Sequence, residues 1–343
     1  MAPKTGLANC TRGAARRALS VGEIIKTEIR GYGRSGKMNG RRSPNVPGMR
    51  NEATRKLRAD LFCSILPLVL AFSALVTFHG GQSNMSTYSF HSNVTATDSL
   101  QNRLEINAKY GSFNFHEWVL SRLGFQPGMD ILDVGCGTGI HAIEALRVLC
   151  GNGSVSALDL SAQSVKIVKD NSAGYGNLDA IVGNMKDLAA IIEDQFRVKR
   201  YDLAYSVYAI WYCPDHFGVL DAMRNALEPG GRLVICTPNA PNGLREAIKR
   251  LGHPRPDLDQ VTSFGPNVLE PYFRTYFDKV VIHLRRNLLR ITAVDDLLRF
   301  YESTGYYVQA VAKELEISAN LEIEMKGYFA LEKNVYMIEG MAR

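Results

Sequence analysis

The sequence lacks the short, fixed spacings by which proteins usually hold a structural metal. None of its six cysteines forms a Cys-x-x-Cys pair, and none of its seven histidines begins a His-Glu-x-x-His motif. Zinc sites of either kind depend on such spacings. We therefore expect no metal, and we expect the cysteines to be reduced thiols of an intracellular protein rather than a disulfide framework.

An excess of positive charge is absent outside the first 60 residues. Residues 1–60 contain 14 Lys and Arg against 4 Asp and Glu, whereas the rest of the chain contains 26 against 30. A domain that binds nucleic acid usually carries a broad basic surface. The mildly acidic body therefore argues against a nucleic-acid partner.

The sequence has a single long apolar run, at residues 61–78. Four polar or proline residues interrupt this run. As a helix it would span about 27 Å, which is borderline for a bilayer. We predict a basic disordered leader at 1–60, this apolar segment at 61–78, a polar linker at 79–98 and a globular domain at 99–343.

Strand-like and helix-like segments alternate from about residue 99 onward. The predicted strands are 129–134, 154–158, 178–182, 201–207 and 232–237. The predicted helices are 100–106, 116–123, 140–149, 162–171, 219–227 and 243–251. This alternation predicts a parallel sheet with helices on its faces. In the tail we expect strands at 279–284 and 289–292, a helix at 294–303, and an antiparallel strand pair at 322–331 and 334–339.

The strongest local signal is Asp130-Ile-Leu-Asp-Val-Gly-Cys-Gly-Thr-Gly139, where an apolar strand runs into three glycines and a helix follows immediately. Glycines permit a tight turn and a close approach of a ligand to the backbone. The free N–H groups at the start of the next helix can bind a carboxylate or phosphate. The alternative is that Gly135, Gly137 and Gly139 serve the turn only.

A second acidic strand end follows at Asp159, 20 positions after Gly139. A carboxylate there can accept hydrogen bonds from both ribose hydroxyls of an adenosine, whether in a dinucleotide or in S-adenosylmethionine. The dinucleotide fingerprint requires Gly or Ala where this sequence has Ile140. Asp133, two residues before the first glycine, can instead hold the ammonium group of a cofactor. Both observations favour S-adenosylmethionine.

With these motifs in place, residues 99–240 resemble a class I S-adenosylmethionine-dependent methyltransferase. Asp133–Gly139 is similar to the first motif of that family, Asp159 to its second-strand acid, and Gly183–Leu188 to the segment after its third strand. The family usually has Asp where Asn184 stands, and Asn can still accept from the adenine amino group. The resemblance implies an α/β fold with a doubly wound, Rossmann-like sheet of seven strands, an antiparallel final strand and an N-terminal helical lid.

The resemblance also implies which residues contact the cofactor. They are Asp133, Gly135, Cys136, Gly137, Gly139, Asp159, Leu160, Asn184 and Met185. Cys136 is expected to present only its backbone, and Met185 taken alone is equally consistent with core packing.

No residue is identified from the sequence as a catalytic base. Positioning supplies much of the rate of a methyl transfer, and a histidine can assist when the acceptor is a hydroxyl. The candidates are His116, His141 and His216, each of which is also consistent with a structural or surface role. The candidates for an acceptor pocket are Tyr110, Tyr208, Trp211 and Tyr212, which could equally be core residues of the lid.

We therefore predict an enzyme that moves a methyl group from S-adenosylmethionine to a small-molecule acceptor. The alternatives are a non-catalytic S-adenosylmethionine-binding protein and an NAD(P)-dependent oxidoreductase with a similar adenosine pocket. The Asn-Pro-Pro-Tyr type of motif, by which amino-group methylases act on nucleic acid, is absent at Ser206–Ile210, after the fourth predicted strand.

The leader permits three interpretations. With the basic residues kept in the cytoplasm, a membrane anchor at 61–78 would export the body, away from its cofactor. An Arg-rich, acid-poor leader could be an organellar transit peptide. We favour the third, a natural start at Met85, and expect a cytoplasmic protein whose residues 1–84 are dispensable for the chemistry.

Overall fold

The computed structural model describes residues 96–256 and 259–343, all within one compact unit that comprises Met85–Arg343. The predicted leader at 1–60, the apolar segment at 61–78 and nearly all of the linker at 79–98 lie outside the described residues. Among the described helices, none combines the length and the apolar character that a membrane span requires.

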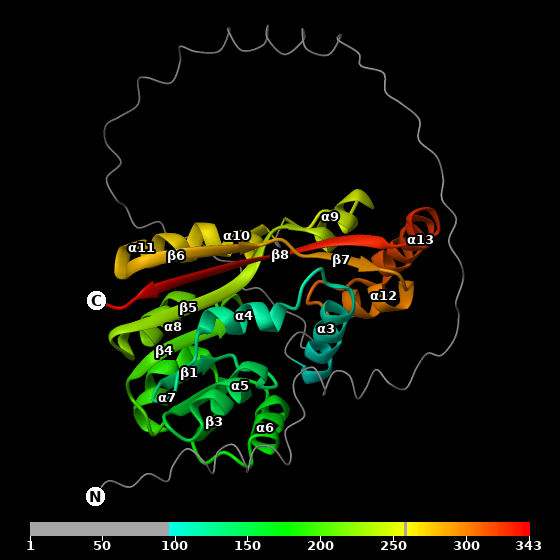
Figure 1. Ribbon diagram of the computed structural model, residues 1–343. Helices are drawn as coiled ribbons and strands as arrows, with labels where there is room; N and C mark the ends of the chain where they lie inside the picture. Colours follow the sequence, from blue (N-terminus) through cyan, green and yellow to red (C-terminus); the bar gives the residue numbers. More distant parts are fainter. Residues whose placement is uncertain (1–95, 257–258) are drawn as a thin grey trace, which may run out of the picture. The chain divides into compact units, whose positions relative to one another are not determined.

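Five parallel strands form the first part of the sheet, and each strand after the first is reached through a helical connection (Figure 1). The strands are β1 (Asp130–Val134), β2 (Ser154–Asp159), β3 (Leu178–Val182), β4 (Tyr201–Val207) and β5 (Leu227–Asn242). The connecting helices are α5 (Ile140–Leu149), α6 (Ala162–Asn171), α7 (Leu188–Asp194) and α8 (His216–Asn225). Their order in space is β3-β2-β1-β4-β5, so the chain reverses direction across the sheet between β1 and β4. Ligands of such sheets bind at this point, beyond the carboxyl ends of the strands.

The sheet is completed by antiparallel strands from the end of the chain. β8 (Phe329–Met341) pairs with β5 on one side. On its other side it pairs with β6 (Asp278–Arg285) and β7 (Leu288–Ile291). The path β3-β2-β1-β4-β5-β8-β6 confirms the predicted seven strands and antiparallel ending, with β7 as a short addition.

The predicted strand pair at 322–331 and 334–339 is wrong. Residues Gln309–Lys326 form helix α13, and the rest of this region is the single long strand β8. Val311, Leu315 and Ala319 recur at the four-residue spacing of a helix and are all buried. Gly327, with a φ of 81°, ends the helix in the left-handed conformation that glycine adopts easily.

Helices cover both faces of the sheet. On one face, α4 (Phe115–Leu123), α5 and α6 pack on β1, β2 and β3. On the other face lie α7, α8, α10 (Asp259–Phe264), the π-helix Gly265–Leu269 and α11 (Glu270–Tyr276). The fold class predicted from the sequence is thereby confirmed.

A third core extends beyond the parallel strands. It joins α3 (Thr97–Tyr110), α9 (Gly243–Arg250), α12 (Val294–Glu302) and α13 to β7 and the first half of β8. We call these elements the cap. Ile106, Phe300 and Leu331 are among its buried residues.

The cysteines only partly match expectation. Cys136, Cys213 and Cys236 are free and buried. Cys150 is disulfide-bonded, so the prediction that all six cysteines are reduced is wrong for this residue. No signal within the sequence distinguishes Cys150 from the others.

Candidate functional site

The glycine turn between β1 and α5 is fixed by its own backbone. The N–H groups of Gly135 and Cys136 both donate to the carbonyl of Leu158, at 2.7 and 3.0 Å. Gly135, Gly137 and Gly139 have φ values of 79°, 54° and 83°. A Cβ on Gly135 would lie 2.3 Å from the Cβ of Ala209. Only glycine meets both requirements at Gly135.

Asp159, at the end of β2, is tied to this turn. Its Oδ2 accepts from the Gly137 N–H and its Oδ1 from the Ser161 N–H, each at 2.8 Å. Burial raises the pKa of its carboxyl. Each carboxylate oxygen can accept more than one hydrogen bond. Asp159 can therefore hold the turn and still accept from two neighbouring hydroxyls.

Asp133, at the other side of the turn, is buried without a cation beside it. Its Oδ2 accepts from the Tyr205 hydroxyl at 2.8 Å, which is its only side-chain hydrogen bond among the described residues. Burial raises its pKa to about 7. A positively charged group bound next to Asp133 would favour its ionised form.

The residues predicted to contact adenine lie around the ends of β2 and β3. Leu160, directly after Asp159, is 56% exposed and is thus accessible to a ligand. Asn184 caps the 3₁₀ helix Met185–Asp187 by accepting from the Lys186 N–H at 3.1 Å. The methyl carbon of Met185 points toward Gly135. An apolar surface thus borders the glycine turn.

Cys136 takes no chemical part in this arrangement. Its thiol is buried, and its Sγ donates only to the Gly137 carbonyl, at 3.7 Å. Burial raises the pKa of the thiol well above its ordinary value. Within the turn, the backbone N–H of Cys136 makes the structural contact, to the Leu158 carbonyl.

Helix α3 covers the glycine turn. A Cβ on Gly137 would lie 2.9 Å from Cδ2 of Leu100. The hydroxyl of Thr97 lies 3.1 Å from the Ser161 Oγ and 2.9 Å from the Ser164 Oγ at the start of α6. The predicted N-terminal lid therefore meets the turn directly.

Two of the three candidate histidines lie together. His116 Nδ1 and His141 Nε2 are 3.4 Å apart, so one ring donates to the other. Burial lowers the pKa of His116 to about 4 and that of His141 to about 3, so both rings are neutral at pH 7. His141 also packs edge-on against Tyr205, the partner of Asp133.

His216 is separate from this pair. It begins α8 and packs edge-on against Phe264, at 5.1 Å between ring centroids. Phe264 belongs to the core on the opposite face of the sheet. The structure therefore does not bring His216 together with His116 and His141.

Three of the four predicted pocket aromatics form one group. Tyr208 contacts Trp211 at 5.3 Å, and Trp211 contacts Tyr212 at 5.0 Å. Phe115 packs edge-on against Tyr208 at 5.2 Å and brings α4 into the group. We call these four residues the aromatic cluster. Tyr208 has a φ of 58°, a strained conformation for a non-glycine residue that is common at functional sites.

Tyr110 is not part of the aromatic cluster. Its hydroxyl donates to Oδ2 of Asp296 at 2.7 Å, and Lys109 pairs with the same oxygen at 2.7 Å. These contacts tie α3 to α12. Tyr110 therefore stabilises the cap and does not line the space beside Tyr208.

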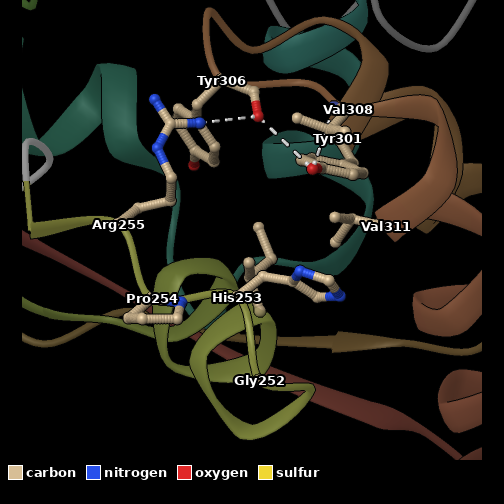
Figure 2. Close-up of a pocket in the computed structure, with 9 residues that line it drawn as sticks. Gly252, His253, Pro254, Arg255, Tyr301, Tyr306, Val308 and Val311 are labelled. Atoms are coloured by element: carbon tan, nitrogen blue, oxygen red, sulfur yellow. Dashed lines mark hydrogen bonds between the residues drawn. The ribbon is translucent and has the colours of Figure 1, made fainter.

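A separate pocket of about 370 Å³ lies between the end of α9 and the segment that joins α12 to α13 (Figure 2). Ile248, Gly252, His253, Pro254, Arg255, Tyr301, Tyr306, Val308 and Val311 line it. Tyr301 and Arg255 both donate to the Tyr306 carbonyl, at 3.3 Å. None of the lining residues belongs to the glycine turn or to the aromatic cluster.

A family model described as a methyltransferase domain matches residues 125–257. This part of the chain is therefore similar to methyltransferase domains. The matched residues include the glycine turn, Asp133, Asp159 and the segment Tyr208–Tyr212. The match confirms the resemblance to class I S-adenosylmethionine-dependent methyltransferases.

Two curated relatives are similar to part of the chain. Demethylmenaquinone methyltransferase of Staphylococcus aureus strain MRSA252 is 29% identical over 129 residues, which are 36% of this chain and 51% of that protein. Malonyl-[acyl-carrier protein] O-methyltransferase 2 of Ilyobacter polytropus is 31% identical over 137 residues, which are 39% of this chain and 49% of that protein. The chain thus spans about half the length of these relatives.

Among solved structures, the phosphoethanolamine N-methyltransferase 2 of Haemonchus contortus is 16% identical to this chain. Its TM-score is 0.44, and the match covers 72% of this chain and 58% of that one.

The geometry of the glycine turn fits S-adenosylmethionine, the cofactor of class I methyltransferases. Asp133 is a buried acid without a cation, which suits the ammonium group of the cofactor. Asp159 retains capacity for two ribose hydroxyls. Leu160 and Met185 offer apolar surface to an adenine ring.

Three residues near the site were not anticipated from the sequence. Tyr205 hydrogen-bonds to Asp133 from the middle of β4. Lys333 lies over the ring of Tyr208, and Arg103 of α3 acts electrostatically on Lys333. The sequence does contain a signal for Lys333, since a lysine inside an otherwise apolar strand is unusual. The predicted strand pair at 322–331 and 334–339 leaves Glu332 and Lys333 between the strands, where a lysine is unremarkable.

Proposed function

We propose that this protein transfers a methyl group from S-adenosylmethionine to a small-molecule acceptor. The observation that carries the proposal is the convergence of Asp133, Asp159 and the glycine turn within the methyltransferase domain. A buried acid and a ribose-binding acid on either side of such a turn suit this cofactor. The mildly acidic body of the chain supports a small acceptor over a nucleic acid.

Different residues of the chain would bind the cofactor, exclude water and contact the acceptor. Asp133 and Asp159 bind the two polar ends of the adenosyl and amino-acid groups, and α3 excludes water from the turn. When bound, S-adenosylmethionine supplies an electrophilic methyl group. Tyr208 of the aromatic cluster directly precedes Ala209, whose side chain lies next to Gly135 of the glycine turn. The aromatic cluster is therefore well placed to contact the acceptor. Holding two reactants in line supplies much of the rate of such a transfer.

His116 is the histidine best placed to assist. It is neutral at pH 7 and neighbours Phe115 of the aromatic cluster, so one of its ring nitrogens can accept a hydrogen bond from an acceptor hydroxyl and orient it. His141 sets the tautomer of His116 through the contact between their rings. His216 is less well placed, because it packs against Phe264 on the opposite face of the sheet.

The proposal is tested by incubating the full chain with S-adenosylmethionine labelled in its methyl group and a panel of small hydroxylated, aminated and carboxylated acceptors. We expect label in at least one acceptor and formation of S-adenosylhomocysteine. Binding of the cofactor without transfer to any acceptor would favour a non-catalytic binding protein. Binding of NAD or NADP in place of S-adenosylmethionine would favour the oxidoreductase alternative.

A further inference from the structure

Lys333 is a partly buried cation in contact with two aromatic rings. It lies on β8, opposite Asn242 of β5. Its Nζ is 5.4 Å from the ring centroid of Tyr208 and 5.6 Å from that of Phe300. Tyr208 follows β4, whereas Phe300 belongs to α12. The ammonium group therefore sits where the parallel sheet meets the cap.

Within the described residues, the ammonium group has no hydrogen-bonding partner and no ion pair besides these two ring contacts. A partly buried charge without a counterion has lost some of its hydration, and a bound anion would compensate for that loss. The geometry points to a partner that the chain itself does not supply.

The charges around Lys333 are positive or neutral. Arg103 of α3, which donates to the Ser303 carbonyl, acts electrostatically on Lys333, as does the thiol of Cys236. Lys333 in turn acts on His116, which is neutral. Burial and Arg103 together lower the pKa of Lys333 to about 7. No carboxylate contributes to this shift, so the site would attract a negative charge.

The location connects Lys333 with methyl transfer. Tyr208, whose ring Lys333 contacts, belongs to the aromatic cluster, and the next residue, Ala209, abuts Gly135 of the glycine turn. A molecule that contacts both Lys333 and the aromatic cluster would therefore lie beside the cofactor site.

We propose that Lys333 binds an anionic oxygen of the methyl acceptor, and hence that the acceptor is a small acid with an aromatic or apolar body. This inference rests on the proposed function for the identity of the ligand as an acceptor. The aromatic cluster and Phe300 would contact the body of the molecule, while the ammonium group of Lys333 donates to its carboxylate or phenolate oxygen.

The test measures binding of three aromatic probes to the full chain at pH 6, below the pKa of Lys333, with S-adenosylhomocysteine present. Benzoate carries a carboxylate, 2,4-dinitrophenolate carries a phenolate at this pH, and benzamide is neutral. Calorimetry is done on the wild type and on the Lys333→Met, Lys333→Arg and Lys313→Met variants. Lys313 is an exposed lysine of α13, so its variant matches the loss of charge.

We expect at least one anion to bind about tenfold or more tightly than benzamide, since hydrogen bonds to charged groups are strong. The anion that binds identifies the acidic group. The preference should be lost in Lys333→Met, retained in part in Lys333→Arg and unchanged in Lys313→Met. The inference is overturned if neither anion binds, if benzamide binds equally well, or if Lys333→Met keeps the preference.

The readout separates this inference from the proposed function. An anion preference that depends on Lys333, in a protein that transfers no label from S-adenosylmethionine, would retain the anion site and contradict the methyltransferase. Transfer of label to neutral acceptors only, with no anion preference, would retain the methyltransferase and overturn the role of Lys333.

Discussion

At the scale of single residues, Asp133 couples the stability of the protein to pH. The pKa of an aspartate in an unfolded chain is about 3.9, whereas burial raises that of Asp133 to about 7. The folded protein thus binds the proton more tightly than the unfolded chain. The penalty for the ionised carboxylate is absent below pH 4, grows as the pH rises to about 7, and is complete above it.

We predict that Asp133→Asn raises the midpoint of thermal unfolding of the cofactor-free protein at pH 8 and leaves it nearly unchanged at pH 4. The same variant should bind S-adenosylmethionine about tenfold or more weakly, because the cofactor ammonium loses a charged partner. Asp170→Asn, at an exposed residue of α6 paired with Lys166, is the control and should show neither effect. A variant that is less stable than the wild type at pH 8 would contradict the burial of an unpaired acid.

The residue scale also shows how far sequence reasoning reaches. Asp133 and Asp159 were identified because each stands next to a strand end in a local motif. Tyr205 and Lys333 were not, because their roles depend on contacts with residues distant in sequence. The same limit explains the histidines, since nothing in the sequence distinguishes the pair of His116 and His141 from His216.

At the scale of elements, the turn between β1 and α5 is the most constrained part of the site. Gly135 and Gly151 have nearly equal φ values of 79° and 82°. A Cβ on Gly135 would meet Ala209, whereas a Cβ on Gly151 would meet no atom within 4 Å. Alanine substitutions at Gly135 and Gly151 therefore separate the energetic effect of the left-handed backbone from that of the clash with Ala209.

We predict that Gly151→Ala costs about 1–2 kcal/mol of stability, the price of a left-handed residue. Gly135→Ala should cost more and should also weaken cofactor binding, because Ala209 and the turn must move apart. Chemical denaturation and cofactor titration of the two variants measure these effects. Equal losses of stability with unchanged cofactor affinity would contradict the close packing of the turn.

Elements with a strong period were predicted well, and the others were not. Helices α5 and α6 and strands β3 and β4 match the sequence prediction residue for residue. In the tail, the predicted strand at 322–331 is wrong because its first five residues belong to helix α13. Its segment Glu322–Lys326 is mostly charged and exposed, so alternation there reflected no buried face. Only the packing of Val311, Leu315 and Ala319 against the cap makes the helix recognisable.

At the scale of the whole molecule, the compact unit that comprises Met85–Arg343 contains every residue of the proposed site. We predict that a chain beginning at Met85 is soluble, unfolds cooperatively and binds S-adenosylhomocysteine as tightly as the full chain. Calorimetry and thermal unfolding of the two chains make the comparison. Loss of activity on truncation, together with fractionation of the full protein with membranes, would show that residues 1–84 act as an anchor.

The central claim, that Asp133, the glycine turn and Asp159 form a site for S-adenosylmethionine, is tested most directly by calorimetric titration with S-adenosylhomocysteine. The account predicts that the wild type binds it and does not bind NAD, and that Asp159→Ala weakens binding by about 1–3 kcal/mol, since both ribose hydroxyls lose their acceptor. Undiminished affinity in Asp159→Ala, or binding of NAD instead, would contradict it.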